Sequence, residues 1–155
     1  LVDRLLEIGA VGCNLEDTDH RNGGLVDAGA HAERLAAIQA AAHDAGVPIV
    51  INARVDTFLP PSGVPVADRV AEAIRRGRRY LGAGADCVYP IGVGEVSDVA
   101  SLVAELPGPV NANPGGAGLD LATLRELGVA RVSYGPRFYR QALANFTTAV
   151  HELVV

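Results

Sequence analysis

The stretch "AAAHDAGVPIVINARVD" (residues 40–56) contains the pattern that decides the fold. It begins as an alanine-rich helix end, passes through Gly46, and continues as an apolar run that finishes in polar residues. A glycine directly after a helix is the expected C-cap, because glycine tolerates the left-handed backbone conformation. The apolar run that follows is typical of a buried strand. The stretch therefore predicts a helix, a tight turn and a core strand in succession.

The same succession recurs along the chain. It is found in "LLEIGAVGCNLED" (5–17), "RRYLGAGADCVYPIG" (78–92) and "TLRELGVARVSYG" (123–135). Strands are expected at 10–16, 48–55, 86–91, 109–113 and 131–135, and helices at 1–8, 29–45, 65–82, 95–106, 119–127 and 137–153. Near-continuous apolar strands that alternate with helices favour a parallel sheet covered by helices. The predicted class is therefore α/β, either a doubly wound sheet or a (β/α) barrel.

The composition limits the kinds of partner. With 155 residues, 49% hydrophobic side chains and a net charge of −5, residues 1–155 are expected to form one globular domain. There is no basic patch, so nucleic acid is not an expected partner. No apolar run approaches the ~20 residues of a membrane span, so no membrane partner is expected either. The arginines at positions 75, 76, 78 and 79 are expected to form a solvated helix face.

Other side chains that could carry chemistry have plain structural explanations. Cys13 and Cys87 lie in apolar runs and are expected to be buried free thiols, which fits a reducing cytoplasm. The histidines His31, His43 and His151 are expected on solvated helix faces. The segment "NPGGAG" (113–118) is either a plain turn or a phosphate-binding nest.

Polar residues gather at the ends of three predicted strands. Residues two apart in a strand share a face of the sheet. The groups that share a face are Asn14 with Glu16, Asn52 with Arg54 and Asp56, and Asn111 with Asn113. In a (β/α) barrel the carboxyl ends of the strands carry the catalytic residues. These side chains therefore predict either a functional site or a set of structural ion pairs among Glu16, Arg54 and Asp56.

The residue types indicate which chemistry such a site could perform. Arginine presents a planar fork that clamps a carboxylate, phosphonate or phosphate group. A glutamate at a strand end suits Mg²⁺, which prefers carboxylate and water oxygens. Together they suit an enolate-forming reaction on a small oxo acid, because a cation stabilises the developing enolate oxygen.

Four segments in this order carry a family resemblance. "GCNLEDTD" (12–19), "INARVDTF" (51–58), "AGADCVYPIG" (83–92) and "NANPGG" (111–116) resemble the phosphoenolpyruvate mutase/isocitrate lyase family, which includes carboxyphosphonoenolpyruvate phosphonomutase. The resemblance implies a (β/α)8 TIM-type barrel, of which this chain would be the C-terminal portion with strands four to eight. It also implies a dimer or tetramer, often with the last barrel helix exchanged between subunits. The implied activity is Mg²⁺-dependent cleavage or rearrangement of a C–C or P–C bond in a small oxo or phosphono acid.

The resemblance also assigns roles to residues. Glu16 resembles the family's Mg²⁺-shell glutamate, Arg54 its substrate-binding and catalytic arginine, and Asn113 an asparagine that contacts the substrate. Asn52 shares the face of Arg54 and is a second candidate for substrate binding. His20 is either an acid/base for bound substrate or a solvated loop histidine.

The chain also departs from the family pattern. The loop "TDHRNGG" (18–24) has no cysteine where family lyases carry their acid/base, so the isocitrate and methylisocitrate lyase route is not expected. Ile91 stands where family members often have Glu or His. The family's aspartate-rich motif is absent, so this chain alone is expected to bind Mg²⁺ poorly. Two alternatives follow: a non-catalytic descendant that binds a small oxo acid, and an incomplete barrel that self-associates through open sheet edges.

Overall fold

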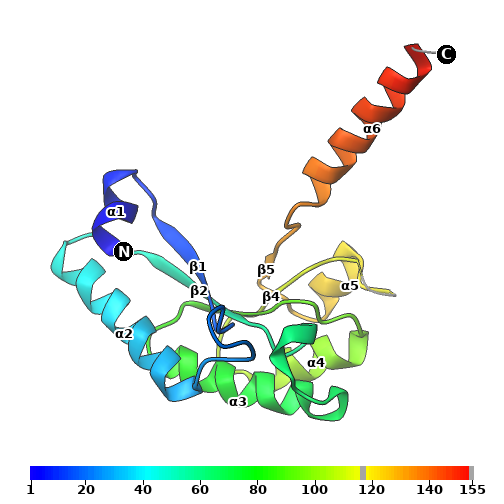
Figure 1. Cartoon of the computed structure of the whole chain (residues 1–155). Coiled ribbons are helices and arrows are strands. Elements are labelled where there is room, and N and C mark those ends of the chain that lie inside the picture. Colours follow the sequence, from blue (N-terminus) through cyan, green and yellow to red (C-terminus); the bar gives the residue numbers. More distant parts are fainter. Residues whose placement is uncertain (116–117, 154–155) are drawn as a thin grey trace.

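Strands and helices alternate throughout the computed structural model, which describes residues 1–115 and 118–153 (Figure 1). The strands are β1 (Gly12–Glu16), β2 (Val50–Val55), β3 (Cys87–Pro90), β4 (Asn111–Ala112) and β5 (Arg131–Val132). The helices are α1 (Val2–Glu7), α2 (Ala28–Asp44), α3 (Arg69–Gly82), α4 (Val96–Glu105), α5 (Leu121–Glu126) and α6 (Arg137–Leu153). Two 3-10 turns, Pro60–Ser62 and Val66–Asp68, connect β2 to α3. The possible phosphate nest at 113–118 includes residues 116–117, which lie outside the described residues.

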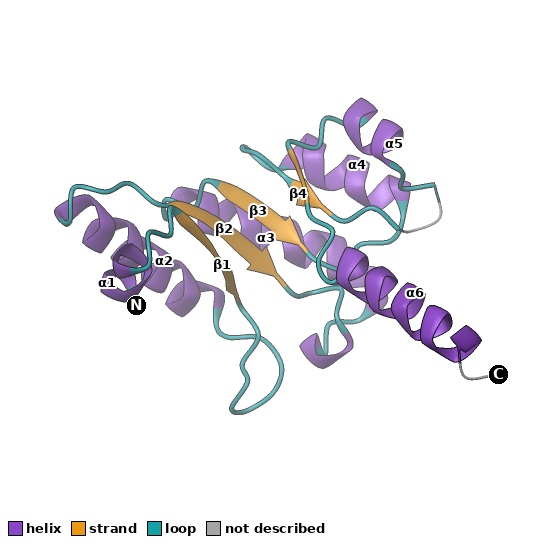
Figure 2. Cartoon of the chain, turned by 90° about the horizontal axis from the view of Figure 1, so that it is seen from above, coloured by secondary structure: helices purple, strands orange, loops and turns teal. Residues whose placement is uncertain are grey.

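The strands run parallel in the order of the chain. β1, β2 and β3 form one sheet and β4 pairs with β5, each pair in parallel register. A parallel bridge between Val88 and Val110 joins the two groups. Figure 2 shows β1, β2 and β3 side by side with their arrows in one direction. The predicted α/β class with a parallel sheet is confirmed. The described strands form an open array, so the closed eight-stranded barrel stays a prediction.

One face of the sheet is covered by α2, α3 and α4, which lie along the lower side of the strands in Figure 1, and α5 lies to the right of β4 and β5. The core between sheet and helices is apolar, and its fully buried members include Leu35, Ile51, Val88, Leu102 and Leu124. Alternation along each strand sends every second side chain into this core and the others to the opposite, concave face. That opposite face is where the polar strand residues lie.

The predicted glycine turns are confirmed, but each of the five described strands is shorter than expected, β4 and β5 most of all. Gly9, Gly46, Gly84 and Gly128 all follow helices with positive φ, at 74°, 71°, 97° and 83°. β4 covers only Asn111–Ala112 within the predicted 109–113. Proline lacks the N–H needed for a ladder hydrogen bond, so Pro109 and Pro114 limit β4 on both sides.

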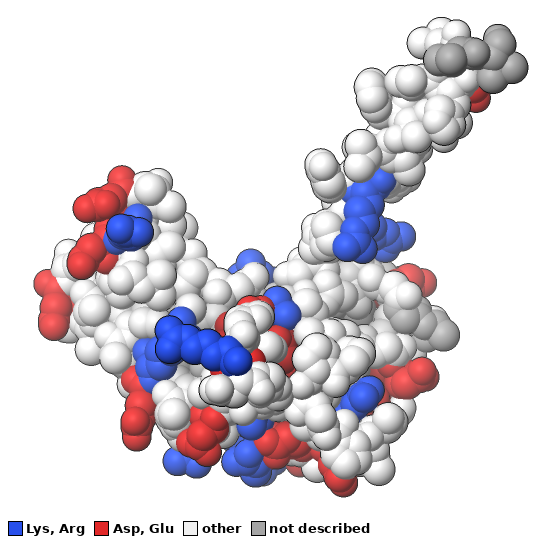
Figure 3. Space-filling model, viewed as in Figure 1, with Lys and Arg blue, Asp and Glu red and all other residues white. Residues whose placement is uncertain are grey.

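Helix α6 projects away from the rest of the described chain (Figure 1). Its apolar side chains are exposed; these are Phe138, Tyr139, Leu143, Phe146, Val150 and Leu153. Basic side chains gather where α6 begins, and elsewhere on the face shown in Figure 3 acidic and basic groups are interspersed. No helix among the described residues is both long enough and apolar enough to cross a membrane.

Candidate active site

The two adjacent acids at the end of β1 lie on opposite sides of the sheet. Glu16 is on the concave face with Asn14, and its side chain is 32% exposed. Asp17 is one residue further, so it points to the side covered by helices, where it is fully buried. Strand alternation alone produces this division, because consecutive side chains point to opposite faces. The pair therefore contributes one carboxylate to an open site and one to the interior.

Arg54 is the centre of the open site. In the parallel register Arg54 lies opposite Glu16 of β1 on one side and Tyr89 of β3 on the other. Its Nη1 is 2.6 Å from Glu16 Oε2. Its Nε and Nη2 donate to the two carboxylate oxygens of Asp56 at 2.6 and 3.0 Å. The predicted ion pairs among Glu16, Arg54 and Asp56 are thus present at the strand ends.

The charges around Arg54 keep it protonated. Burial acts to lower the pKa of Arg54, but the hydrogen bonds and charge of Asp56, and then the charge of Glu16, outweigh it and raise the pKa above its usual value. The Arg54 side chain is 25% exposed, so the guanidinium is partly open to solvent. A fixed, accessible cation of this kind can bind an anionic group.

His20 lies beside the carboxylate of Glu16. Its Nε2 contacts Glu16 Oε1, and the side chain is 71% exposed. The loop that carries it is held by Asp19, which accepts hydrogen bonds from the backbone N–H groups of Arg21 and Asn22 at 2.9 and 3.1 Å. The structure therefore brings His20 to the site, and its role as an acid/base stays a prediction.

Asn52 lies beneath Arg54 and not at the opening. It is fully buried, and its Nδ2 donates to Asn14 Oδ1 at 2.5 Å. The side-chain Oδ1 of Asn52 has no hydrogen-bond partner within residues 1–115 and 118–153. Asn52 lies on the same face of the sheet as Arg54, as predicted from the sequence, while its role in substrate binding stays a prediction.

Asn113 borders a pocket at the ends of β3, β4 and β5. Its Nδ2 donates to the Ser133 carbonyl at 2.7 Å, and its Oδ1 accepts from the Tyr89 hydroxyl at 2.7 Å. The pocket has a volume of about 450 Å³, and its lining includes Tyr89, Ile91, Asn113 and Tyr134. Burial raises the pKa of Tyr89, so its hydroxyl stays neutral and donates. The opening thus has a charged part around Arg54 and an uncharged part around Asn113.

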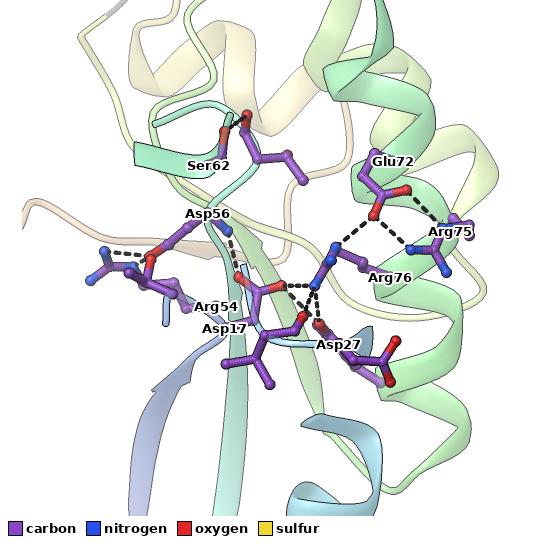
Figure 4. A network of polar contacts seen from close by, with 12 residues as sticks. Asp17, Asp27, Arg54, Asp56, Ser62, Glu72, Arg75 and Arg76 are labelled. Atoms are coloured by element: carbon purple, nitrogen blue, oxygen red, sulfur yellow. Dashed lines mark hydrogen bonds and ion pairs between the residues drawn. The ribbon is translucent and has the colours of Figure 1, made fainter. Parts of the chain in front are cut away.

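A buried polar cluster lies directly behind the site (Figure 4). Asp17 Oδ1 accepts a hydrogen bond from the backbone N–H of Asp56 at 2.9 Å. Asp17 Oδ2 accepts from the Tyr80 hydroxyl at 2.7 Å and from Arg76 Nη1 at 3.1 Å. Arg76 also donates to the Val26 carbonyl at 2.9 Å. This cluster joins the ends of β1 and β2 to helix α3.

Two expectations from the sequence are wrong here. Arg76 is only 6% exposed and is not part of a solvated arginine face, because it lies on the inward side of α3 with Ala73, Gly77 and Tyr80. His31 is 1% exposed and packs edge-on against Tyr80, with 4.8 Å between ring centroids. The helical spacing of residues 73, 76, 77 and 80 is the signal that could have separated Arg76 from the other arginines.

The residues present fit a magnesium ion only in part. No group of three or more His, Cys, Asp or Glu side chains that could hold a metal exists in the portion of the chain that the structure describes. Glu16 offers a partly exposed carboxylate, whereas Asp56 is 1% exposed and committed to Arg54. Mg²⁺ is usually bound by one or two carboxylates together with water and substrate oxygens. Glu16 can be one such ligand, and weak Mg²⁺ binding by this chain alone stays a prediction.

The architecture and the site define a class: α/β proteins with a parallel sheet and polar groups at the carboxyl ends of the strands. Residues 1–154 match the family described as phosphoenolpyruvate phosphomutase. The chain therefore belongs to the phosphoenolpyruvate phosphomutase family.

Known relatives agree with this assignment. A Mycobacterium tuberculosis protein of uncharacterised function is 34% identical over 143 residues, which cover 92% of this chain and 51% of that protein. A crystal structure of a proposed phosphonomutase from Burkholderia cenocepacia is 36% identical and has a TM-score of 0.89, covering 97% of this chain and 61% of that one. A proposed lyase/mutase from the same organism is 32% identical with a TM-score of 0.87, covering 98% and 54%. The chain spans about half the length of the curated relatives it matches.

Proposed function

We propose that the protein is an enzyme that cleaves or rearranges a C–C or P–C bond of a small 2-oxo or phosphono acid through an enolate. The observation that carries this proposal is Arg54, a partly exposed guanidinium held at the strand ends between Glu16 and Asp56. Membership in a family of mutases and lyases supports the reaction class.

Arg54 is the residue that binds the acid group of the substrate in this proposal. Asp56 engages Nε and Nη2, which fixes the plane of the guanidinium. The remaining Nη1 faces Glu16 and the opening. A substrate carboxylate or phosphonate would bind at this exposed edge and be oriented by it. The same positive charge would stabilise the enolate as negative charge develops.

Glu16 is the residue of this chain that would hold Mg²⁺, directly or through water. When bound, Mg²⁺ would supply further stabilisation for the enolate oxygen. His20, next to Glu16, is the candidate for moving a proton to or from the bound acid. Asn113, with the Tyr89 hydroxyl, would orient the uncharged part of the substrate, and Asn52 would support Asn14 and Arg54 from below.

The proposal is tested by turnover in the full-length protein. Purified enzyme with Mg²⁺ is assayed against oxaloacetate, phosphonopyruvate and methylisocitrate, with products followed by NMR. One of the first two acids is expected to react, and Glu16→Gln is expected to lower turnover at least about 10-fold, since charge stabilisation by a metal contributes several kcal/mol. Glu105→Gln is the matched control, because Glu105 is exposed on the outer surface and pairs with Arg78 away from the site. Absence of turnover with every acid, or equal rates for both variants, contradicts the proposal.

A second candidate function is binding of a small oxo acid without catalysis. The observation that favours it is that both oxygens of Glu16 are engaged, one by Arg54 and one by His20, so the charges are balanced within the chain. This function predicts oxalate binding that does not depend on Mg²⁺ and no conversion of any acid. A Glu16→Gln variant that abolishes a measured activity excludes it.

The exposed stripe on α6 supports a proposal for the oligomeric state. Tyr139, Leu143, Phe146 and Val150 follow helical spacing along one side and are exposed. An exposed apolar stripe of this kind marks an interaction surface. We propose that α6 packs against a second copy in a dimer or tetramer. Light scattering of Phe146→Asp is expected to show a smaller assembly than the wild type, and an unchanged mass contradicts the proposal.

A further inference from the structure

We propose that Asp17 is a positioning residue that sets the orientation of Arg54 through Asp56. This inference rests on the proposed function of Arg54 as the acid-binding residue. Asp17 does not reach the opening, because it lies on the far side of the sheet from Glu16 and is fully buried. It contacts the backbone of Asp56, whose carboxylate is the partner of Arg54.

The contacts form a continuous path from Asp17 to the guanidinium. Asp17 Oδ1 accepts from the backbone N–H of Asp56 at 2.9 Å, so the end of β2 is tied to the end of β1. The Asp56 carboxylate then accepts from Arg54 Nε at 2.6 Å and from Nη2 at 3.0 Å. Arg54 Nη1 forms an ion pair with Glu16, which directly precedes Asp17 in the chain. A displacement of Asp17 would therefore move both partners of Arg54.

Helix α3 holds the other side of the Asp17 carboxylate. Tyr80 donates to Oδ2 at 2.7 Å and Arg76 at 3.1 Å, and both residues are buried. Arg76 is itself held by Glu72, whose Oε1 accepts from Nε at 2.7 Å. Figure 4 shows this cluster between the strand ends and α3. The carboxylate is thus held between the end of β2 and helix α3, as a group that positions an active site must be.

Stability alone is a weak reason for burying this ion pair. Removing two charges from water is costly, and well-packed apolar residues often serve a fold as well or better. The buried ion pair of Asp17 and Arg76 lies where Asp17 also accepts from the backbone N–H of Asp56. Positioning of Asp56, the partner of Arg54, is a functional reason for burying this charge in addition to any contribution to stability.

A double-mutant cycle on oxalate binding tests the inference in the full-length protein. Oxalate with Mg²⁺ is the probe, and its dissociation constant is measured by calorimetry for wild type, Asp17→Asn, Tyr80→Phe, Arg54→Ala and the two double variants. In the wild-type background Asp17→Asn is expected to weaken oxalate binding about 3- to 100-fold, the range of coupling between residues in one network. In the Arg54→Ala background the same change is expected to have an effect below about 2-fold. Tyr80→Phe is the milder second variant, and it carries the test if Asp17→Asn does not fold.

Asp27→Asn is the matched control. Asp27 is a carboxylate near the cluster that caps α2 by accepting from the N–H groups of Gly29 and Ala30. Its loss is expected to lower the melting temperature and to leave the oxalate affinity of the otherwise wild-type protein unchanged. If Arg54→Ala leaves oxalate affinity unchanged, the proposed function fails and the inference with it. If Arg54→Ala weakens binding but Asp17→Asn and Tyr80→Phe act equally in both backgrounds, or not at all, only the inference is overturned.

Discussion

Tyr80→Phe removes one buried hydroxyl and leaves the ring in place. The Tyr80 side chain is fully buried, and its ring packs edge-on against His31. Burial, and then the charge of Asp17, raise the pKa of Tyr80 well above its usual value, so the hydroxyl is protonated and donates to Asp17 at 2.7 Å. It also accepts from Arg76 at 3.1 Å. The substitution therefore deletes two hydrogen bonds to charged groups without creating a large cavity.

The magnitude follows from those two bonds. A hydrogen bond to a charged partner contributes about 1.5–3 kcal/mol. Asp17 still accepts from the backbone N–H of Asp56 and from the side-chain Nη1 of Arg76. The loss of folding free energy therefore stays near the value of one such bond. The free energy of unfolding is expected to fall by about 1.5–3 kcal/mol. At about 2–4 °C per kcal/mol for a domain of this size, the melting temperature would fall by roughly 3–12 °C.

Urea denaturation and calorimetry of the full-length protein measure this change. The denaturation midpoint is expected to fall while the slope m is unchanged, since the surface exposed on unfolding is the same. Ser101→Ala is the control: its hydroxyl donates to the Ser97 carbonyl on an exposed part of α4, and its loss is expected to change stability by less than about 0.5 kcal/mol. A loss below about 0.5 kcal/mol for Tyr80→Phe as well would refute the reasoning about the buried cluster.

Three further predictions concern the fold. A Cβ added at Gly12 would lie 2.7 Å from the Val50 carbonyl oxygen, so Gly12→Ala is expected to push β1 away from β2. The free energy of unfolding measured by urea denaturation is expected to fall by about 1–3 kcal/mol, and an unchanged denaturation midpoint would contradict this. Burial lowers the pKa of His31 below its usual 6.5, so the unfolded state binds the proton more tightly and stability is lost as pH falls below about 6.5. His31→Gln is expected to flatten the unfolding free energy between pH 8 and 5, and an equally steep profile would count against this. Burial raises the pKa of Cys87 to about 11, so at pH 8 a thiol reagent is expected to label the partly exposed Cys13 first, and equal labelling by mass spectrometry would overturn it.

The sequence predicted the open part of the site because one rule governs it. Period-two alternation places Glu16 and Arg54 on one face of neighbouring strands, and the register of β1 on β2 brings them opposite each other. The same rule, applied one residue further, sends Asp17 inward. The C-cap glycines were predictable for a similar reason, since each follows from local backbone conformation.

The buried cluster was harder to predict because it depends on a distant contact. Arg76 lies among other arginines, and a run of charges usually indicates a solvated face. Its actual partner, Asp17, is 59 positions away in the chain. Only the packing of α3 against the strand ends brings the two together. The length of β5 likewise depends on pairing with β4, which local sequence does not fix.

The proposed function depends on one claim, that Arg54 binds the acid group of the substrate. It is tested most directly by kcat/KM of wild type and Arg54→Ala on whichever acid the full-length enzyme converts, with Arg78→Ala as the control arginine on the outer surface. Loss of a charge-assisted contact of about 1.5–3 kcal/mol predicts a fall of roughly 10- to 150-fold for Arg54→Ala, with no comparable change for Arg78→Ala. Equal values of kcat/KM for wild type and Arg54→Ala would contradict the claim.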